Sequence, residues 1–277
     1  MYKLTDEQLE MQEMFRDFAE KEVAPKAIEV DENHRFPEEN VKKMQELGFF
    51  GIPFDEEYGG NGQDTLTYVL AVEELAKVCA TTSVIISAHT SLCGDCINKF
   101  GTEEQKEKYL TPLASGEALG AFALTEPDAG TDAAGQKTVA VLDGDHYVLN
   151  GSKIFITNAG YADTYVVFAM TDKSQGTRGI SAFIVEKDFE GFKTGTIEDK
   201  MGIKGSSTRE LVFTDCKVPK ENLLGEEGKG FKVAMQTLDG GRIGIGAQAL
   251  GIAEGALAKA VKYVKEREQF GRPLAKF

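Results

Sequence analysis

The apolar residues between position 1 and about position 118 recur at helical spacing. One predicted helix carries apolar residues three or four apart, at Met11, Met14, Phe15 and Phe18. Two helix starts have the residue pair of a capping box, in which each side chain binds the other residue's backbone N–H. These pairs are Thr5 with Gln8 and Thr102 with Gln105. We therefore expect an N-terminal all-helical section.

The pattern changes after Gly116 to short apolar runs rich in Val, Ile and Phe, separated by turn residues. The runs cover 139–142, 146–150, 153–157, 164–170, 179–186 and 210–213. About six short strands at this spacing predict an antiparallel sheet, folded as a sandwich or a small barrel. Asn150-Gly151 lies between two runs and is typical of a type I′ turn, so it predicts a hairpin there.

Helical spacing returns from about Lys229. Aliphatic residues recur every seven positions, at Ile243, Leu250, Leu257 and Val264, which predicts a helix packed along a narrow seam. Each glycine inside a helix costs about 1 kcal/mol relative to alanine. We expect close approach of a neighbouring helix to compensate this cost at Gly244, Gly246, Gly251 and Gly255.

Together these patterns predict an α+β protein with three domains in the order α, β, α. The expected bounds are 1–118 for the helical domain, 119–228 for the β domain and 229–277 for a C-terminal helical bundle. The last section is too short for a complete four-helix bundle, so we expect it to be the first part of one.

Charge and composition exclude several classes of partner. The 45 acidic residues outnumber the 31 basic ones, giving a net charge of −14, and contacts to nucleic acid phosphates need clustered Lys and Arg. No apolar run approaches the roughly 20 residues that span a bilayer. The first residues are polar and acidic and resemble no targeting segment. We expect a cytoplasmic protein with reduced thiols, no nucleic acid partner and no membrane insertion.

Most isolated motifs favour plain structural roles. Residues 225–230 resemble a P-loop only weakly, because acidic residues replace its usual neighbours. The three histidines are scattered without metal-ligand spacing. Cys93 and Cys96 form a single C-x-x-C with no second pair, which favours packing on a helix over redox chemistry.

The segment 123–135 is a stronger candidate for chemistry. It joins the helical and β sections and is rich in small and hydroxyl residues, so its backbone N–H groups can approach a nucleotide or flavin closely. Composition alone still favours an interdomain linker. Phe155 and Thr157 end a predicted strand on one face, since they are two residues apart.

Taken together, these stretches resemble the acyl-CoA dehydrogenase family, most closely its short-chain, butyryl-CoA type. Residues 123–135 (ALTEPDAGTDAAG) match the family's first signature. Six further blocks match in the same order, at 53–60, 150–158, 199–213, 218–231, 235–251 and 267–274.

The resemblance implies FAD between the β section and the C-terminal helices. It assigns Thr125 to the pyrimidine edge, Phe155 to the ring system, Thr157 to N5, and Arg267 to the diphosphate of FAD in a neighbouring subunit. The full implied FAD-binding set is Phe122, Ala123, Leu124, Thr125, Glu126, Pro127, Gly130, Thr131, Phe155, Ile156, Thr157, Arg267, Gln269 and Phe270. The implied substrate-binding set is Thr131, Asp239, Gly240, Gly241 and Arg242.

The implied reaction is α,β-dehydrogenation of an acyl-CoA, with electrons passed to an electron-transferring flavoprotein by a homotetramer or dimer of dimers. A carboxylate removes the α-proton while the β-hydrogen leaves as hydride. The resemblance places this glutamate beyond Phe277. The alternative family position is occupied here by Gly241, which has no group to accept a proton. We therefore expect no catalytic base within residues 1–277. Two alternatives are an oxidase-like enzyme that reduces oxygen and a truncated, non-catalytic FAD-binding fragment.

Overall fold

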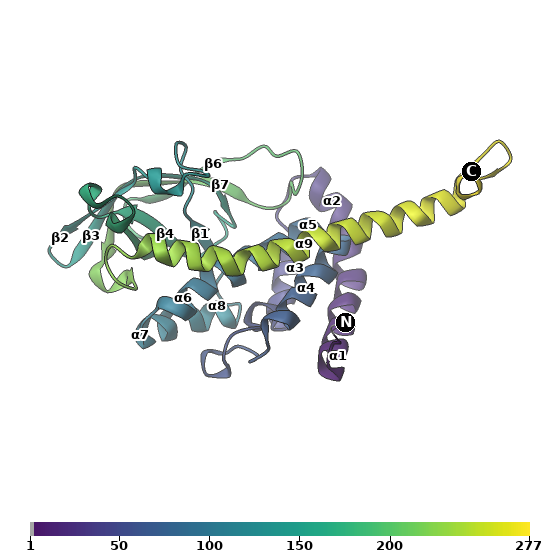
Figure 1. Cartoon of the computed structure of the whole chain (residues 1–277), viewed down its shortest axis with the longest axis horizontal. Helices are drawn as coiled ribbons and strands as arrows, with labels where there is room; N and C mark the ends of the chain where they lie inside the picture. Colours follow the sequence, from purple (N-terminus) through teal and green to yellow (C-terminus); the bar gives the residue numbers. More distant parts are fainter. Residues whose placement is uncertain (1–2) are drawn as a thin grey trace.

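The computed structural model describes residues 3–277 and shows a helical section, a β section and one long C-terminal helix (Figure 1). This order of sections confirms the sequence prediction. The helices are α1 (Asp6–Phe18), α2 (Ala27–Glu32), α3 (Glu38–Glu46), α4 (Thr65–Val78), α5 (Ala80–Ala88), α6 (Asp95–Phe100), α7 (Glu103–Gln105), α8 (Thr111–Ala114) and α9 (Gly230–Glu266). No helix in residues 3–277 is long and apolar enough to cross a membrane.

Both predicted capping boxes are present. The Thr5 hydroxyl accepts from Gln8 N at 3.1 Å at the start of α1, and the Gln8 side chain accepts from Thr5 N. Thr102 and Gln105 form the same pair of bonds at α7. Helix α4 is buried along most of its length and packs against α1, α5 and α9. The helical section is therefore organised around α4.

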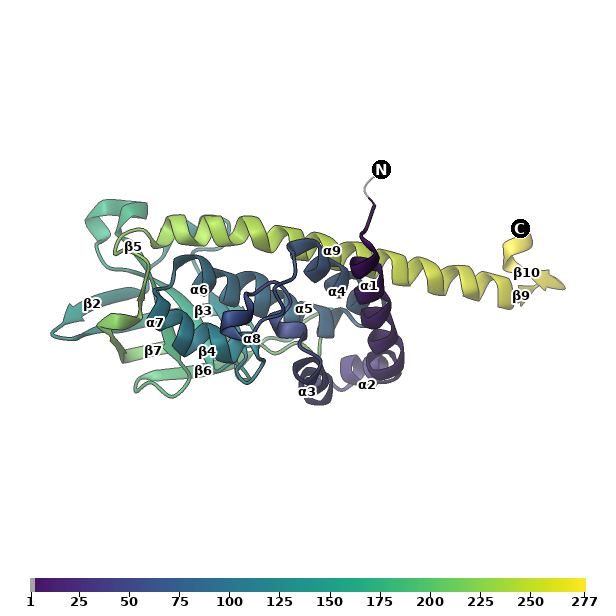
Figure 2. The same cartoon turned by 90° about the horizontal axis from the view of Figure 1, so that it is seen from below.

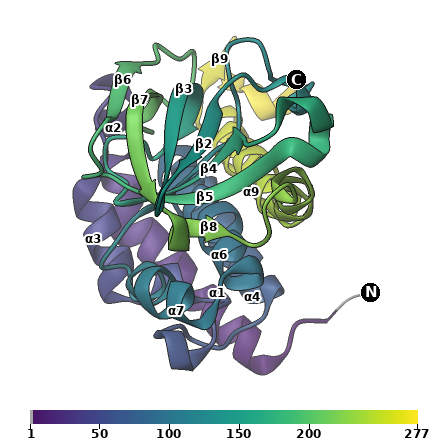
Figure 3. The same ribbon diagram turned by 90° about the vertical axis from the view of Figure 1, so that its left-hand side faces the viewer.

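The β section forms one eight-stranded sheet in the order β6-β7-β3-β2-β4-β5-β8, with β1 beside β4. The strands are β1 (Gly120–Ala123), β2 (Val139–Asp143), β3 (His146–Thr157), β4 (Thr164–Met170), β5 (Ile180–Glu186), β6 (Phe192–Ile197), β7 (Thr208–Pro219) and β8 (Leu223–Leu224). A separate short hairpin joins β9 (Glu268–Gln269) to β10 (Arg272–Pro273). Figure 3 shows the sheet above α6 and α7, with α9 seen end-on beside β5.

The sheet is mixed rather than purely antiparallel. Strand β1 pairs with β4 in parallel, and β2 meets β4 in parallel at Val139 and Met170. Strand β1 has the sequence GAFA and lacks the β-branched residues that strands β2 to β7 contain. Its pairing therefore left no signal in the apolar pattern, although it brings the helical section directly to the centre of the sheet.

The predicted hairpin at Asn150-Gly151 is wrong, because β3 runs straight through these residues. The register against β7 shifts between Leu149 and Gly151, so the pair forms a bulge instead of a turn. Gly151 has a φ of +145°, and a Cβ there would lie 2.5 Å from Thr138 Oγ1. The turn between β2 and β3 lies earlier, at Gly144 with a φ of +63°.

Helix α9 packs closely on the helical section through glycine, as predicted, at three of four positions. A Cβ would lie 2.7 Å from Tyr68 Oη at Gly244, 2.3 Å from Glu73 O at Gly251 and 2.1 Å from Lys77 O at Gly255. The prediction is wrong for Gly246, which has no atom within 4 Å of an added Cβ.

The aliphatic heptad of α9 does not form the seam. Ile243, Leu250 and Leu257 are exposed, while small residues on the other side of the helix contact α4 and α5. The first half of α9 lies along the body of the molecule, and its second half extends beyond it (Figures 1 and 2).

Candidate functional site

A cavity of about 410 Å³ lies where the loop after β1, the end of β3 and the first half of α9 meet. It is lined by Ala88, Leu92, Phe122, Leu124, Thr125, Gly130, Thr131, Ala133, Phe155, Ile156, Thr157, Met235, Leu238 and Arg242. Segments from the helical section, the β section and α9 thus contribute to one cavity.

The loop between β1 and β2 is held in a defined shape beside this cavity. Residues Glu126 to Ala129 form a tight turn closed by two backbone hydrogen bonds of 3.1 Å between the end residues. Ile154 N donates to Thr125 O at 2.9 Å, which ties the loop to β3. The backbone N–H groups of Thr125, Gly130 and Thr131 have no hydrogen-bond partner within residues 3–277. The loop therefore has unpaired backbone donors at three residues that line the cavity.

The end of β3 presents an aromatic ring. Phe155 has a φ of +59° and is 58% exposed, both unusual for a large apolar residue in a strand. The register against β7 shifts between Lys153 and Ile156, so this region is a bulge. Bulges re-aim side chains beside functional sites. Ile156 is buried, and Thr157 lines the same cavity as Phe155.

Helix α9 forms the opposite wall with Met235, Leu238 and Arg242, which share one helix face because they are three and four residues apart. Arg242 also makes an ion pair with Asp239. A second cavity of about 270 Å³ adjoins the first and shares Ala88, Leu92, Thr157, Leu238 and Arg242 with it. Its further lining residues are Val84, Ser87, Ser91, Gly241 and Ile245. No acidic residue lines either cavity in the described part of the chain.

A buried ion pair lies beneath the loop. Lys153 Nζ and Glu126 Oε1 are 2.7 Å apart, and the side chains are 0% and 4% exposed. Burial lowers the pKa of Lys153 to about 8, although the Glu126 carboxylate opposes this shift. Burial alone would raise the pKa of Glu126, but Lys153 and the N–H donors around the carboxylate outweigh it and lower that pKa.

Three family models match consecutive parts of this chain. They describe the N-terminal, middle and C-terminal domains of acyl-CoA dehydrogenases and match residues 5–117, 121–216 and 228–277. The chain belongs to the acyl-CoA dehydrogenase family. This confirms the resemblance inferred from the sequence.

Individual relatives support the same assignment. A short-chain specific acyl-CoA dehydrogenase of Clostridium acetobutylicum is 66% identical over 276 residues, which cover 100% of this chain and 73% of the relative. The solved structure of butyryl-CoA dehydrogenase from Megasphaera elsdenii has a TM-score of 0.97 and 58% identity, covering 100% of this chain and 73% of that one. A chain in a structure described as the electron transferring flavoprotein of Acidaminococcus fermentans has a TM-score of 0.98 and 64% identity, with the same two coverages.

Acyl-CoA dehydrogenases depend on FAD, and the residues at the larger cavity fit a flavin. Three hydroxyls, of Thr125, Thr131 and Thr157, border it beside the exposed ring of Phe155. The open backbone donors of the loop add partners for oxygen and nitrogen atoms of such a ring. A polar ring edge and an aromatic face thus both find complementary groups.

The structure brings some of the residues assigned by resemblance together and separates others. Nine of them line the larger cavity: Phe122, Leu124, Thr125, Gly130, Thr131, Phe155, Ile156, Thr157 and Arg242. Ala123 is buried in β1, Glu126 faces Lys153, and Pro127 lies exposed in the turn. Gly241 lines the smaller cavity, whereas Asp239 and Gly240 line neither. Arg267, Gln269 and Phe270 lie at the far end of α9 (Figure 1).

Several lining residues were not identified from the sequence, namely Ala88, Leu92, Ala133, Met235 and Leu238. Ala88 and Leu92 are four apart, as are Leu238 and Arg242, so each pair shares a helix face. For Ala88 and Leu92 that spacing is the only available signal, and ordinary core residues show it too. Ala133, Met235 and Leu238 lie inside the matched blocks 123–135 and 235–251, which did not distinguish them from their neighbours. Lys153 was also missed, because a lysine inside an apolar strand run looks like a solvent-facing position.

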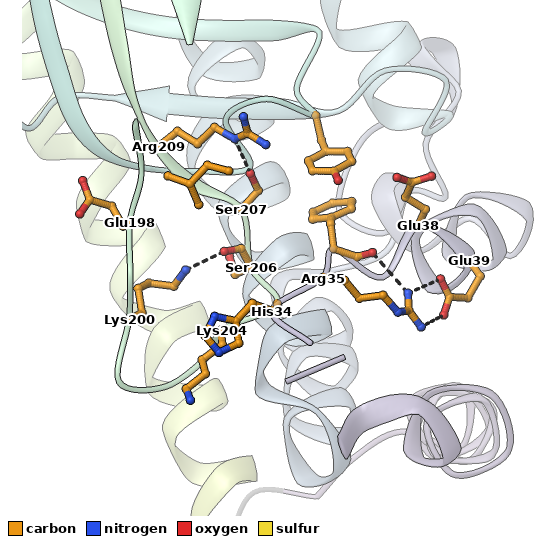
Figure 4. A pocket seen from close by; sticks show the side chains of 14 residues that line it. His34, Arg35, Glu38, Glu39, Glu198, Lys200, Lys204, Ser206, Ser207 and Arg209 are labelled. Carbon is orange, nitrogen blue, oxygen red and sulfur yellow. Dashed lines mark hydrogen bonds and ion pairs between the residues drawn. The ribbon is translucent and has the colours of Figure 1, made fainter. Parts of the chain in front are cut away.

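A different groove of about 380 Å³ lies between the helical and β sections (Figure 4). None of the residues assigned by resemblance lines it. Its positive side chains are largely engaged: Arg35 makes ion pairs with Glu29 and Glu39, and Lys200 Nζ donates to Ser206 O at 2.7 Å. Phe36 and Tyr161 stack with ring centroids 3.9 Å apart and close one side. The groove therefore lies at the boundary between the two sections, apart from the candidate flavin site.

Proposed function

We propose that this protein is an FAD-dependent dehydrogenase of short-chain acyl-CoA thioesters that passes electrons to an electron-transferring flavoprotein. The observation that carries the proposal is the pairing of two adjoining cavities in a member of this family. One has hydroxyls, open N–H donors and an aromatic ring, and the other is mainly apolar. The first suits a flavin and the second a short acyl chain.

Bound FAD supplies the hydride acceptor. The residues of this chain bind and orient the flavin and the thioester. Thr125 and Thr131 offer hydroxyls and backbone N–H groups from the loop, and Thr157 offers a hydroxyl from β3. Phe155 gives the ring system an apolar contact. Ala88, Leu92 and Ile245 give the smaller cavity an apolar lining.

The general base is proposed to come from outside residues 1–277. No carboxylate among the described residues lines either cavity. Proton abstraction requires a group within hydrogen-bond reach of the α-carbon. We accordingly expect these 277 residues alone to bind flavin and thioester without oxidising the thioester.

The remaining assignments are proposals as well. They are domain bounds at 1–118, 119–228 and 229–277, a homotetramer or dimer of dimers, a cytoplasmic location and a role in fatty acid metabolism. Arg267, Gln269 and Phe270 are proposed to contact FAD bound by a neighbouring subunit, and Asp239 to Arg242 to contact acyl-CoA.

The test separates flavin, substrate and electron acceptor. The purified chain is loaded with FAD, and butyryl-, octanoyl- and palmitoyl-CoA are titrated by calorimetry. The flavin is then reduced chemically without oxygen and mixed either with an electron-transferring flavoprotein or with air-saturated buffer. We expect retained FAD, tightest binding of butyryl-CoA, and faster reoxidation by the flavoprotein than by oxygen.

Each part has a contrary result. A chain that stays colourless with excess FAD contradicts the flavin site. Tighter binding of palmitoyl-CoA contradicts the short-chain assignment. Reoxidation that is faster in air supports the oxidase-like alternative instead.

A further inference from the structure

We propose that the buried ion pair of Lys153 and Glu126 positions the loop that faces the flavin, so that flavin affinity depends on this pair beyond its effect on folding. The proposal rests on the proposed function, since it concerns the same flavin site. Neither side chain lines the cavity, so both act through the loop as positioning residues.

All the hydrogen bonds that the Lys153 ammonium group donates go to residues of the loop. Its Nζ donates to Glu126 Oε1 at 2.7 Å, to Gln136 Oε1 at 3.0 Å and to Leu124 O at 3.2 Å. An ammonium group has three N–H donors, so all three are directed at residues between positions 124 and 136. The lysine thus holds the two ends of the loop to one point on β3.

Glu126 completes this arrangement from the loop side. Its carboxylate accepts from Lys137 N at 2.6 Å and from Thr138 N at 3.1 Å. These donors lie at the far end of the loop, next to the start of β2. The carboxylate therefore closes the loop on itself. Gly130, Thr131 and Ala133 between the two ends line the cavity, as does Thr125 just before Glu126.

The pair also couples the loop to the aromatic wall. Lys153 lies two residues before Phe155, and the intervening Ile154 N donates to Thr125 O at 2.9 Å. A shift of the loop relative to β3 would consequently move Thr125 and Phe155 apart. A flavin that contacts both Thr125 and Phe155 therefore needs the distance between the loop and β3 that the Lys153–Glu126 pair maintains.

Removing one partner leaves the other charge buried and unpaired, which is costly in itself. A loss of stability would therefore not distinguish positioning from folding. Glu74 provides a matched control, because it is a buried carboxylate with 2% side-chain exposure that pairs with Arg16 and Lys77 in the helical section. Glu74 lines neither cavity.

The experiment compares Glu126→Gln, Lys153→Met, the double variant and Glu74→Gln. The FAD dissociation constant is measured by flavin fluorescence at a temperature where circular dichroism shows each variant folded. Hydrogen exchange of residues 124–138 is measured without flavin. We expect Glu126→Gln and Lys153→Met each to weaken FAD binding at least tenfold and to speed exchange in the loop. The double variant leaves no lone buried charge. Its FAD dissociation constant should equal that of the single variant that binds FAD more weakly, because the two residues act as a unit.

Glu74→Gln should keep the FAD dissociation constant within twofold of wild type, even if its melting temperature falls as much as that of Glu126→Gln. Wild-type FAD affinity and slow loop exchange in folded Glu126→Gln would overturn the positioning role. If the single variants do not fold, the same two measurements on the double variant decide the question. Failure of the wild-type chain to bind FAD would instead contradict the proposed function.

Discussion

His89 is a buried titratable residue whose role is structural. It follows α5, and its ring is fully buried. Gly120 N donates to Nδ1 at 3.0 Å, and Nε2 lies 3.1 Å from Leu113 O, which lets it donate. The neutral ring is thus satisfied on both nitrogens, and it links the helical section to β1. This agrees with the structural role that the sequence favours for the scattered histidines.

The buried site of His89 predicts a pH dependence of stability. Burial lowers its pKa from 6.5 to about 4, against a smaller opposite effect of the Leu113 carbonyl. The unfolded chain therefore takes up a proton between about pH 6.5 and 4 that the folded chain does not, and folding stability falls as the pH decreases through this window. Linkage gives a loss of about 3 kcal/mol.

Urea unfolding at several pH values between 7 and 4 measures this loss. The variant His89→Gln, which does not titrate, should lose less stability over the same interval than the wild type. Equal slopes in wild type and His89→Gln would contradict the expectation.

At the scale of the element, two glycines of α9 differ in how closely the helix approaches its neighbours. Gly251 and Gly246 lie in the same helix and differ in surroundings. A Cβ at Gly251 would lie 2.3 Å from Glu73 O, a backbone atom of α4, whereas Gly246 has no atom within 4 Å. The same substitution should therefore have opposite effects at the two positions.

Gly251→Ala should destabilise the fold by about 1–3 kcal/mol, because the helix must move away from α4. Gly246→Ala should stabilise it by about 0.5–1 kcal/mol, since alanine restricts the unfolded chain and favours helix. Chemical unfolding of both variants measures the two changes. A destabilised Gly246→Ala, or an unchanged Gly251→Ala, would contradict the packing described for α9.

Helices α1, α7 and α9 and strand β3 show which features local sequence patterns predict and which they do not. Capping boxes at Thr5 and Thr102 were predictable because all their partners lie within four residues. The heptad of α9 misidentified the buried face, because periodicity reveals a stripe but not which neighbour covers it. The bulge at Gly151 depends on Thr138 from another strand, so local turn statistics favoured a hairpin.

The residues of the candidate site also fall into those that the sequence predicts and those that only the fold reveals. The loop and Phe155 were predicted through a contiguous signature and a short block. Lys153 required knowledge that β3 passes beneath the loop, which only the assembled sheet provides. Met235 and Leu238 are recognised as cavity-lining residues only from the packing of α9 against that loop.

At the scale of the whole molecule, the residues assigned to FAD by resemblance fall into two distant groups. One group surrounds the cavity near Arg242, and the other follows the end of α9 at Arg267. A helix rises about 1.5 Å per residue, so these two positions are separated by roughly 37 Å. Arg267 therefore cannot reach the cavity of its own chain, and its proposed contact with FAD requires a second subunit.

This separation predicts that flavin retention depends on subunit association. Arg267→Ala should lower the flavin content after gel filtration, because a diphosphate loses a bidentate partner. Wild-type protein should lose flavin on dilution for the same reason. Arg272→Ala is the control, since Arg272 lies at the same end of the chain and stacks on Phe277 at 4.0 Å.

A mixing experiment sharpens the test. Thr157→Val impairs the cavity but keeps Arg267, whereas Arg267→Ala keeps the cavity. Mixed assemblies contain interfaces with one intact cavity facing one intact arginine, so mixing the two variants should restore part of the flavin content that each lacks alone. Flavin content that is unchanged in Arg267→Ala and insensitive to dilution would show that each chain holds FAD by itself. No restoration on mixing, with mixed assemblies verified by mass spectrometry, would place the effect of Arg267 within its own chain.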